Sequence, residues 1–303
     1  MLTKICVGIV IAQIFRYVIP WLYKNFLGPY FFGKNFNFRK YGEWAIVTGG
    51  SAGIGKAFAE KLAQKGMNLI LISNVPHELD AVANQIESRF KVKTLVINID
   101  FTKGVGVYDV IKQKIKGLDI GVLVNNVGIG YPGPLQFHEL AVHENFFWDI
   151  ISINLLTIPF MTKLVIHQML EKNKGLIINI SSLDATFPVP VCLYSAIKAY
   201  MNKFTEDFNI EYQGKDISMQ AINPGAVRTD LWTVECGPWL KPSAKVYVES
   251  AFNTIGMGNN TIGYYPHVLL QLFIKGIHFM CPFIYNKLIW LNQKMQKPKL
   301  KRR

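Results

Sequence analysis

The fold of this chain is decided by the stretch Ala45-Ile46-Val47-Thr48-Gly49-Gly50-Ser51-Ala52-Gly53-Ile54-Gly55-Lys56-Ala57. Its apolar residues predict a buried strand, the small residues a tight turn, and the residues from 55 onward a helix. Such a unit aims main-chain N–H groups and the positive end of a helix at one point, which suits a phosphate. An ordinary glycine-rich turn is the alternative, because the spacing G-x-x-x-G-x-G differs from the general G-x-G-x-x-G fingerprint.

Apolar runs continue to alternate with helical patterns beyond this stretch. Strands are predicted at 45–48, 68–73, 94–99, 121–124, 176–180 and 219–222. Helices are predicted at 56–65, 77–90, 107–116, 144–171 and 195–212. This alternation indicates an α/β fold, a doubly wound parallel sheet of the Rossmann type covered on both faces. A ligand site is expected at the carboxyl ends of the strands, near the point where the strand order reverses.

Composition favours contact with a membrane. Of the 303 residues, 50% are hydrophobic, and the formal net charge is +13 with the basic excess at the two ends. Basic ends beside apolar segments suggest an anionic membrane surface rather than nucleic acid, for which no binding pattern is found. The four cysteines are far apart and the six histidines show no metal spacing, so neither a disulfide framework nor a metal site is expected.

The N-terminal region predicts a membrane anchor. Residues 5–15 are apolar and uncharged, Arg16 interrupts, and 17–23 resume the apolar run. Joined across Arg16, the run just reaches the length that spans a bilayer. A cleaved signal peptide is the alternative, but no small-residue cleavage site follows. The positive charge after the segment predicts that the body lies on the cytosolic side.

Polar residues follow the second, third and fourth predicted strands. Asn74 stands where an acid would bind the ribose of NAD or a basic residue the extra phosphate of NADP. The carboxylate of Asp100 is suited to accept a hydrogen bond from an adenine amine or to cap a turn. Asn125 and Asn126 are suited to hold a ribose and a neighbouring strand.

The pattern with the most chemical content is Tyr194-x-x-x-Lys198, with Ser181 and Ser182 upstream at the end of the fifth strand. Residues four apart share one face of a helix. A tyrosine with its ordinary pKa near ~10 is a poor acid–base group at neutral pH, and a nearby ammonium favours the phenolate. A serine hydroxyl beside it suits a substrate carbonyl. Alone this spacing is typical of a solvated helix face, but with the glycine turn and the strand-end residues it indicates catalysis.

Four motifs, taken in order, resemble the signatures of the short-chain dehydrogenase/reductase family across residues 44 to 230. They are Thr48-Gly49-x-x-x-Gly53-Ile54-Gly55, Asn125-Asn126-x-Gly128, Tyr194-x-x-x-Lys198 and Pro224-Gly225-x-Val227-x-Thr229. Flanking stretches such as Lys40-Tyr41-Gly42-x-Trp44-Ala45 resemble its membrane-bound branch. That branch holds 17β-hydroxysteroid dehydrogenases of types 3 and 12 and very-long-chain 3-oxoacyl-CoA reductases.

The resemblance implies a catalytic set of four residues. Tyr194 would protonate a carbonyl oxygen, Lys198 would lower the pKa of Tyr194 and hold the ribose, and Ser182 would orient the carbonyl. Asn154 would anchor a water that relays protons to Lys198, and Pro159 is expected to loosen the helical turn just after Asn154. The implied cofactor-binding residues are Gly49, Ser51, Gly53, Ile54, Gly55, Asn74, Asp100, Asn125, Asn126, Tyr194, Lys198, Val227 and Thr229.

Three departures from the family pattern leave alternatives open. The gap between Ser182 and Tyr194 is one residue shorter than usual, so Ser181 is the alternative catalytic serine. Asn74 replaces the arginine of the branch, although Asn74 and nearby serines are suited to bond a phosphate. NADP(H) is therefore the expected cofactor, with NAD(H) as the alternative. Pro224-Gly225 resembles the wider family more than the branch, which leaves the substrate open.

The C-terminal part of the sequence predicts membrane contact and a retrieval signal. Residues 231–240 are predicted to be a lid over a hydrophobic ligand or a packed surface loop, and 268–291 an amphipathic or re-entrant membrane-facing segment. Lys299 and Lys301 match the K-x-K-x-x retrieval pattern of endoplasmic reticulum membrane proteins, with a solvated basic tail as the alternative.

The expected organisation is a membrane anchor and basic linker (1–40), a Rossmann domain (41–260) and a membrane-facing extension (261–303). The expected function is NADP(H)-dependent reduction of 3-oxoacyl-CoA in very-long-chain fatty acid elongation, at the endoplasmic reticulum membrane with the catalytic domain in the cytosol. A 17β-hydroxysteroid or other steroid or retinoid dehydrogenase and a non-catalytic cofactor-binding scaffold are the alternatives. Expected partners are a hydrophobic or acyl-CoA substrate, membrane lipid and a second copy of the chain.

Overall fold

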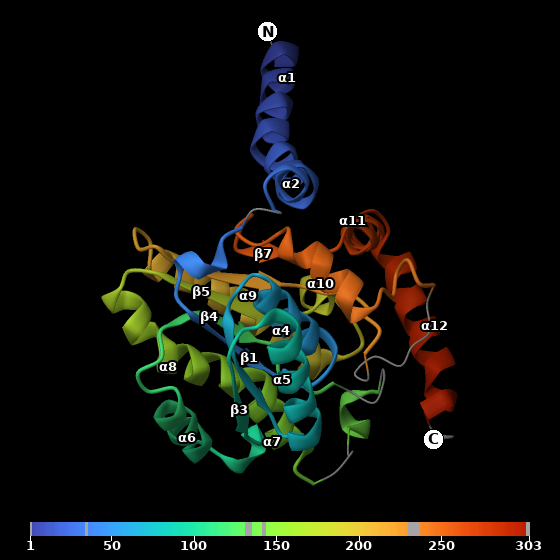
Figure 1. Ribbon diagram of the computed structural model, residues 1–303. Helices are drawn as coiled ribbons and strands as arrows, with labels where there is room; N and C mark the ends of the chain where they lie inside the picture. Colours follow the sequence, from blue (N-terminus) through green and yellow to red (C-terminus); the bar gives the residue numbers. More distant parts are fainter. Residues whose placement is uncertain (1, 34–35, 131–134, 141–143, 230–236, 301–303) are drawn as a thin grey trace.

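The computed structural model describes residues 2–33, 36–130, 135–140, 144–229 and 237–300. A seven-stranded sheet with the order β3-β2-β1-β4-β5-β6-β7 forms its centre, and every pair is parallel (Figure 1). The strands are β1 (Trp44–Thr48), β2 (Asn68–Ser73), β3 (Thr94–Asn98), β4 (Ile120–Asn125), β5 (Gly175–Ile180), β6 (Ile217–Ile222) and β7 (Asn260–Thr261). The strand order reverses between β1 and β4, which confirms the predicted doubly wound sheet.

Helices cover both faces of the sheet. On one face the core is formed with α4 (Gly53–Gln64), α5 (Pro76–Phe90) and α10 (Ala244–Phe252). On the other face it is formed with α6 (Gly106–Lys114), α8 (Thr157–Glu171) and α9 (Cys192–Glu211). Alternate residues of one strand divide between the two cores, as with Val47 and Ile46 of β1, both fully buried. Short 3-10 turns are η4 (Phe38–Lys40), η5 (Phe101–Lys103), η6 (Phe137–Glu139) and η8 (Leu183–Thr186).

The six predicted strands and five helical regions are confirmed, with differences at their ends. β4 is longer than predicted at both ends, and β3 ends at Asn98 rather than Ile99. β7 and α10 were not expected. β7 has only two residues, Asn260 and Thr261, paired with the end of β6, so it carries no alternating pattern. It lies across the boundary predicted at residue 260.

The predicted helix at 144–171 is three segments in the structure. They are α7 (Phe146–Ile151), a π-helical turn η7 (Ser152–Leu156) and α8. Pro159 has no N–H and its ring would clash with the carbonyl four residues earlier, so the wider turn relieves the helix there. Two more π turns, η1 (Ile14–Val18) and η2 (Tyr23–Leu27), also end shortly before a proline. The expected loosening beside Asn154 is therefore present.

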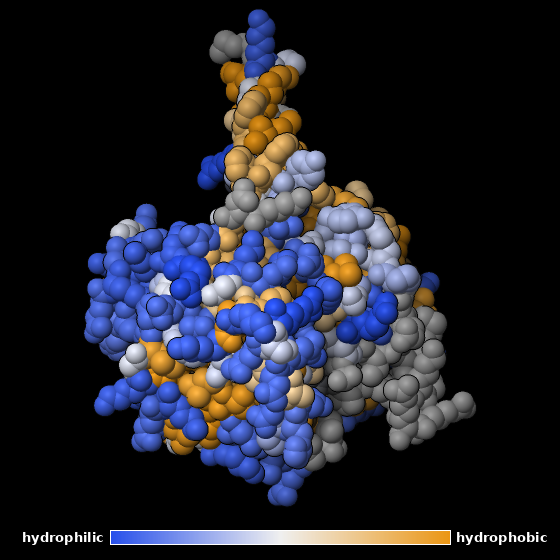
Figure 2. Space-filling model, in the orientation of Figure 1, coloured by the Kyte–Doolittle hydropathy of each residue, from blue (hydrophilic) through white to orange (hydrophobic). Residues whose placement is uncertain are grey.

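The N-terminal segment is a helical stalk. It runs through α1 (Leu2–Gln13), η1, α2 (Ile19–Leu22), η2 and α3 (Gly28–Phe31). Residues Thr3–Phe31 are long and apolar enough to cross a membrane. Figure 1 shows the stalk projecting from the body, and Figure 2 shows its largely hydrophobic surface above a largely hydrophilic body. A second apolar helical stretch, Phe146–Glu171, is half buried in the fold.

The C-terminal extension forms two helices, α11 (Tyr265–Met280) and α12 (Pro282–Leu300). α11 contacts η2 at the base of the stalk, and α12 runs down the side of the body away from it (Figure 1). Both carry exposed apolar side chains, among them Phe273 on α11 and Phe283 on α12. The retrieval-like pattern ends in residues 301–303, which lie outside the described residues.

Candidate active site

The turn after β1 has the geometry that a phosphate-binding turn requires. Gly49 and Gly53 have positive φ values of 66° and 55°, a backbone region that residues other than glycine rarely adopt. A Cβ on Gly55 would lie 2.1 Å from the carbonyl oxygen of Gly49. α4 begins at Gly53 without a side-chain cap, so its first N–H groups point into the turn. These residues, together with Ser51 and Ile54, fit the phosphates of a dinucleotide.

Thr48 and Asn126 fix this turn to β4. Thr48 Oγ1 accepts from the main-chain N–H groups of Asn126 and Val127 at 3.0 and 3.1 Å. In return, Asn126 Nδ2 donates to the carbonyls of Thr48 and Gly49 at 3.0 and 3.2 Å. The side chain of Asn126 therefore binds the turn itself.

Asn125 belongs to a buried chain of amides. Its Nδ2 donates to Asn179 Oδ1 at 2.9 Å, and Asn179 Nδ2 donates to Thr205 Oγ1 at 3.0 Å. This chain joins β4, β5 and α9, the element that carries Tyr194. Asn125 Oδ1 is buried and has no hydrogen-bond partner in the described part of the chain. Of the two roles predicted for Asn125, the side chain therefore performs one, which is to hold the neighbouring strand β5.

The predicted adenosine end lies where β2 and β3 stop. Ser51 Oγ and Ser73 Oγ are 3.0 Å apart, and Asn74 beside them is exposed. Asp100 Oδ1 accepts from the N–H and the hydroxyl of Thr102 at 3.0 and 2.8 Å. Asp100 therefore acts as a turn cap, the alternative that its position allowed, and contact with adenine stays a prediction.

Ser182 and Tyr194 come together above the end of β5. The Ser182 hydroxyl lies close enough to the Tyr194 phenol to lower its pKa, and Ser182 Oγ accepts from the main-chain N–H of Asp184 at 3.1 Å. Ser181 turns away, because its hydroxyl donates to the main-chain oxygen of Lys198 at 2.8 Å. Lys198, 4% exposed, has its Nζ 5.6 Å from the centre of the Tyr194 ring and bonded to the carbonyl of Ile180 at 2.8 Å. Of the two candidate serines, Ser182 is the one beside the phenol.

Burial controls the protonation of this pair. It lowers the pKa of Lys198 to about 8. Burial and the charge of Asp184 raise the pKa of Tyr194 above its ordinary value, and the bond from Ser182 opposes them. The expectation that the Tyr194 pKa is lowered is therefore wrong here, because burial of the phenol and the charge of Asp184 raise it. A protonated phenol at neutral pH is a group that can donate a proton.

Asn154 lies in the π turn and is fully buried. Its Oδ1 accepts from the N–H of Ile129 at 2.8 Å and its Nδ2 donates to the carbonyl of Ile129 at 2.7 Å. A Cβ on Gly128 would lie 3.0 Å from Asn154 Oδ1 and 3.8 Å from Lys198 Nζ. Asn154 therefore fixes the chain after β4 beside Lys198, and a water held there stays a prediction.

The loop after β6 brings Val227 and Thr229 to the glycine turn. Val227 is buried, and a Cβ on Gly53 would lie 3.1 Å from Thr229 Cγ2. Beside this contact is a cavity of about 380 Å³ whose lining includes Lys56 and Arg228. Residues 230–236, most of the predicted lid, lie outside the described residues.

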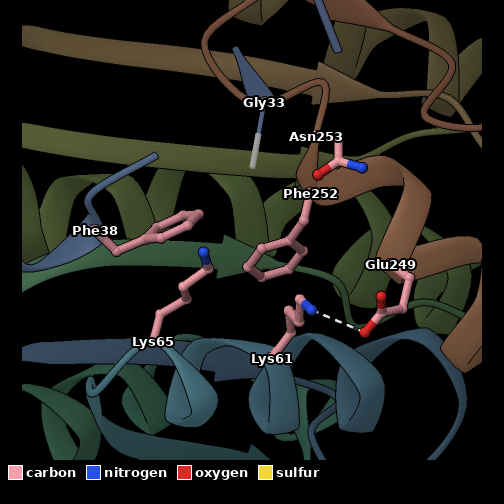
Figure 3. Close-up of a pocket in the computed structure, with 7 residues that line it drawn as sticks. All are labelled: Gly33, Phe38, Lys61, Lys65, Glu249, Phe252 and Asn253. Atoms are coloured by element: carbon pink, nitrogen blue, oxygen red, sulfur yellow. Dashed lines mark hydrogen bonds and ion pairs between the residues drawn. The ribbon is translucent and has the colours of Figure 1, made fainter. Parts of the chain in front are cut away.

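A second pocket lies at the opposite end of α4, between the linker that follows the stalk and the end of α10. Figure 3 shows Lys61 of α4 and Lys65, the residue after that helix, pointing toward it, with Lys61 bound to Glu249 at 2.8 Å. Its volume is about 240 Å³. It holds none of the predicted site residues.

Three residues that shape the site were not predicted from the sequence. Asp184, two residues after Ser182, could not be singled out because one acid in a loop carries no spacing signal. His267 is fully buried, accepts from the N–H of Gly225 at 3.1 Å and lies 3.0 Å from the carbonyl oxygen of Leu240. It thus joins both ends of the loop that holds Val227 and Thr229. Asn179 carried a usable signal, since it is a polar residue inside an apolar strand.

The fold and this cluster of hydroxyl, phenol and amine place the molecule among the dinucleotide-binding oxidoreductases. The chain belongs to the short chain dehydrogenase family, whose sequence profile matches residues 43–235. Its activity is therefore that of an oxidoreductase acting on an alcohol or carbonyl group.

The very-long-chain 3-oxoacyl-CoA reductase of Bos taurus is 44% identical over 230 residues, which cover 76% of this chain and 73% of that protein. The inactive hydroxysteroid dehydrogenase-like protein 1 of Homo sapiens is 40% identical over 243 residues, covering 78% and 73%.

Solved structures share the fold. The short-chain dehydrogenase from Sphingobium yanoikuyae in complex with NADPH matches with a TM-score of 0.66 and 24% identity, over 72% of this chain and 86% of that chain. A short chain dehydrogenase/reductase from Burkholderia phymatum in complex with NAD matches with a TM-score of 0.67 and 21% identity, over 80% and 95%.

Proposed function

We propose that this chain reduces the 3-keto group of long acyl-CoA substrates with NADP(H) as the hydride source. The observation that carries the proposal is the grouping of Ser182, a Tyr194 phenol that burial keeps protonated, and Lys198, whose Nζ lies 5.6 Å from the centre of the Tyr194 ring. The 44% identical reductase supports the substrate class. A nicotinamide supplies the hydride when bound.

Each residue of the site has a role that follows from its position. Ser182 donates to the substrate carbonyl and Tyr194 gives its proton to the carbonyl oxygen as negative charge develops there. Lys198 is suited to hold ribose hydroxyls through its Nζ. The glycine turn at 49–55 binds the phosphates, Asn154 fixes the chain beside Lys198, and Val227 and Thr229 lie where a carboxamide would meet the turn.

The residues at the predicted adenosine end of the cofactor site favour NADP(H) over NAD(H). The paired hydroxyls of Ser51 and Ser73 and the amide of Asn74 are uncharged donors suited to a phosphate, and position 74 holds no acid to select a free ribose. Native protein is expected to bind NADPH more tightly than NADH in fluorescence titrations. Asn74→Arg is expected to widen that preference, because guanidinium pairs with phosphate. A native preference for NADH would contradict this part of the proposal.

A membrane location of the endoplasmic reticulum, with the body in the cytosol, completes the proposal. The exposed apolar stalk and the apolar face of α11 beside its base support it. Self-association stays a prediction.

A substrate panel tests the activity. Microsomes that contain the full chain are supplied with NADPH and either a long 3-oxoacyl-CoA or a keto-steroid. NADPH consumption with the acyl-CoA alone is the expected result, and turnover of the steroid alone would replace the proposal with the steroid alternative. A relative that is called inactive keeps the scaffold alternative in view. Lack of turnover with either substrate, together with unchanged phenotypes in Tyr194→Phe, would favour it.

A further inference from the structure

The cavity of about 380 Å³ beside the glycine turn lies between the first turns of α4 and α10. These two helices pack against each other on one face of the sheet (Figure 1). Gly53 and Thr229 line the cavity and also belong to the predicted cofactor site, so the two sites share a wall. Ser73, at the predicted adenosine end, closes β2 on one side of β1, whereas Thr229 follows β6 on the other side. The cavity therefore borders the cofactor site away from its adenosine end.

Three cationic residues line this cavity, and each comes from a different element. Lys56 belongs to the first turn of α4, Arg228 to the loop after β6, and Lys245 to the first turn of α10. Glu60 is the one carboxylate among the described residues of the lining. Arg228 and Lys245 are exposed and Lys56 is half-buried, so all three are open to a ligand from solvent. None of the three forms an ion pair with another residue in the described ranges, so their charges are not neutralised there.

The main chain holds these cations around the cavity. The N–H of Arg228 donates to the carbonyl of Pro242 at 2.9 Å, and Arg228 pairs with Ser243 in an isolated parallel bridge. Ser243 caps the start of α10 with its hydroxyl. Gly53 and Ala244, the first residues of α4 and α10, both line the cavity, and the helix dipole favours negative charge at such ends. The cavity thus combines an excess of cations with two helix ends of the same sign, which suits a ligand with several negative charges.

We propose that this cavity binds the phosphates of the CoA part of the substrate, and that Lys56, Arg228 and Lys245 select CoA thioesters. The inference rests on the proposed function, which it deepens. CoA carries a diphosphate and a 3′-phosphate beyond its pantetheine arm, so these charges lie away from Tyr194 when the keto group meets the phenol. Cations at a cavity next to the catalytic site provide the partners that such phosphates need, and they also attract the substrate from solution.

NADP(H) carries phosphates as well, but the proposed cofactor site supplies other donors for them. The main-chain N–H groups of residues 49–55 are the donors proposed for the diphosphate, and the hydroxyls of Ser51 and Ser73 those for the extra phosphate. Lys245 lies on α10, which contributes no predicted cofactor residue. Cations that serve the substrate should therefore affect the binding of acyl-CoA and leave the binding of NADPH nearly unchanged.

The test compares Arg228→Gln/Lys245→Gln with the native full chain on two thioesters of the same 3-oxoacyl group. One is the CoA thioester, and the other is the N-acetylcysteamine thioester, which has no phosphate. The double variant is expected to raise KM for the CoA thioester about tenfold without lowering kcat, and to change KM for the phosphate-free thioester and Kd for NADPH by less than about twofold. Added salt should raise the native KM for the CoA thioester alone. Lys112→Gln, exposed on α6 across the sheet, is the matched control and should change none of these values.

Direct binding of CoA separates this inference from the proposed activity. Calorimetric titration of CoA into native protein saturated with NADPH should detect binding, and the double variant should weaken it about tenfold, whatever substrate is turned over. Absence of CoA binding, an equal rise in KM for both thioesters, an unchanged KM for the CoA thioester, or a matching loss of NADPH affinity would overturn the inference. If the double variant does not fold, Lys245→Gln alone serves the same comparison. Failure of every 3-oxoacyl-CoA to react, with CoA binding that the variant weakens, would overturn the proposed function alone.

Discussion

Tyr194 and Lys198 lie in surroundings that oppose the charged form of each side chain. Burial raises the pKa of the phenol and lowers that of the amine to about 8. At neutral pH the phenol therefore keeps its proton, and Lys198 keeps a charge that costs stability in the buried site. The spacing of the two residues is visible in the sequence, but these pKa directions depend on how deeply α9 packs on the sheet.

Replacing the buried amine is expected to stabilise the protein while removing its activity. Lys198→Met should raise the free energy of unfolding by about 1–2 kcal/mol at pH 7, because a buried charge is removed. Unfolded lysine keeps its proton to about pH 10.5. Native Lys198 loses its proton near pH 8, so native stability rises as pH increases between these values and the gain from the variant shrinks.

Denaturant unfolding of the full chain in detergent at pH 7 and pH 9.5 measures this difference. Lys203→Met, on the exposed side of the same helix, is the matched control and should change little. A gain that grows with pH would contradict the assigned direction of the Lys198 pKa.

The glycine turn shows how much of an element can be predicted from sequence. The strand, turn and helix of residues 44–64 follow from apolar and glycine patterns, and so do the other five long strands. β7 could not be predicted, because two residues carry no period and the pairing comes from tertiary contact with β6. The amide chain from Asn125 to Thr205 also joins residues far apart in sequence, so only the sheet order brings them together.

Gly55 is the point where this element tolerates no side chain. Gly55→Ala is expected to weaken NADPH binding at least tenfold and to lower the free energy of unfolding by about 1–3 kcal/mol, because the added Cβ would meet the Gly49 carbonyl. Gly106→Ala is the control, since a Cβ there meets nothing within 4 Å. It should change stability by no more than about 1 kcal/mol. Calorimetric NADPH titration and thermal unfolding of both variants check this, and equal behaviour would contradict the close approach.

At the scale of the whole molecule, the stalk and α11 form one apolar region. Exposed aromatic residues Tyr30, Phe31 and Phe32 lie at the stalk base, and α11 next to it exposes Leu272 and Phe273. Aromatic residues are typical of the membrane interface. The sequence predicted one membrane-facing extension, but the break after Met280 sends α12 along the body, and that turn is not visible in composition.

A depth measurement tests this region. A spin label at Phe273→Cys, in a chain whose other cysteines are serine, is expected to be more accessible to oxygen than to a polar nickel reagent in lipid vesicles. The same label at Ile210→Cys, exposed on α9, should show the opposite order. Preference of the Phe273 label for the polar reagent would show that α11 does not enter the lipid.

The proton of Tyr194 is the central claim, and single-turnover reduction of a long 3-oxoacyl-CoA by NADPH tests it most directly. Tyr194→Phe removes the hydroxyl and keeps the ring, so NADPH should bind as before while the rate of its consumption falls by about 10²–10⁴-fold. A variant that consumes NADPH at the native rate would contradict the account.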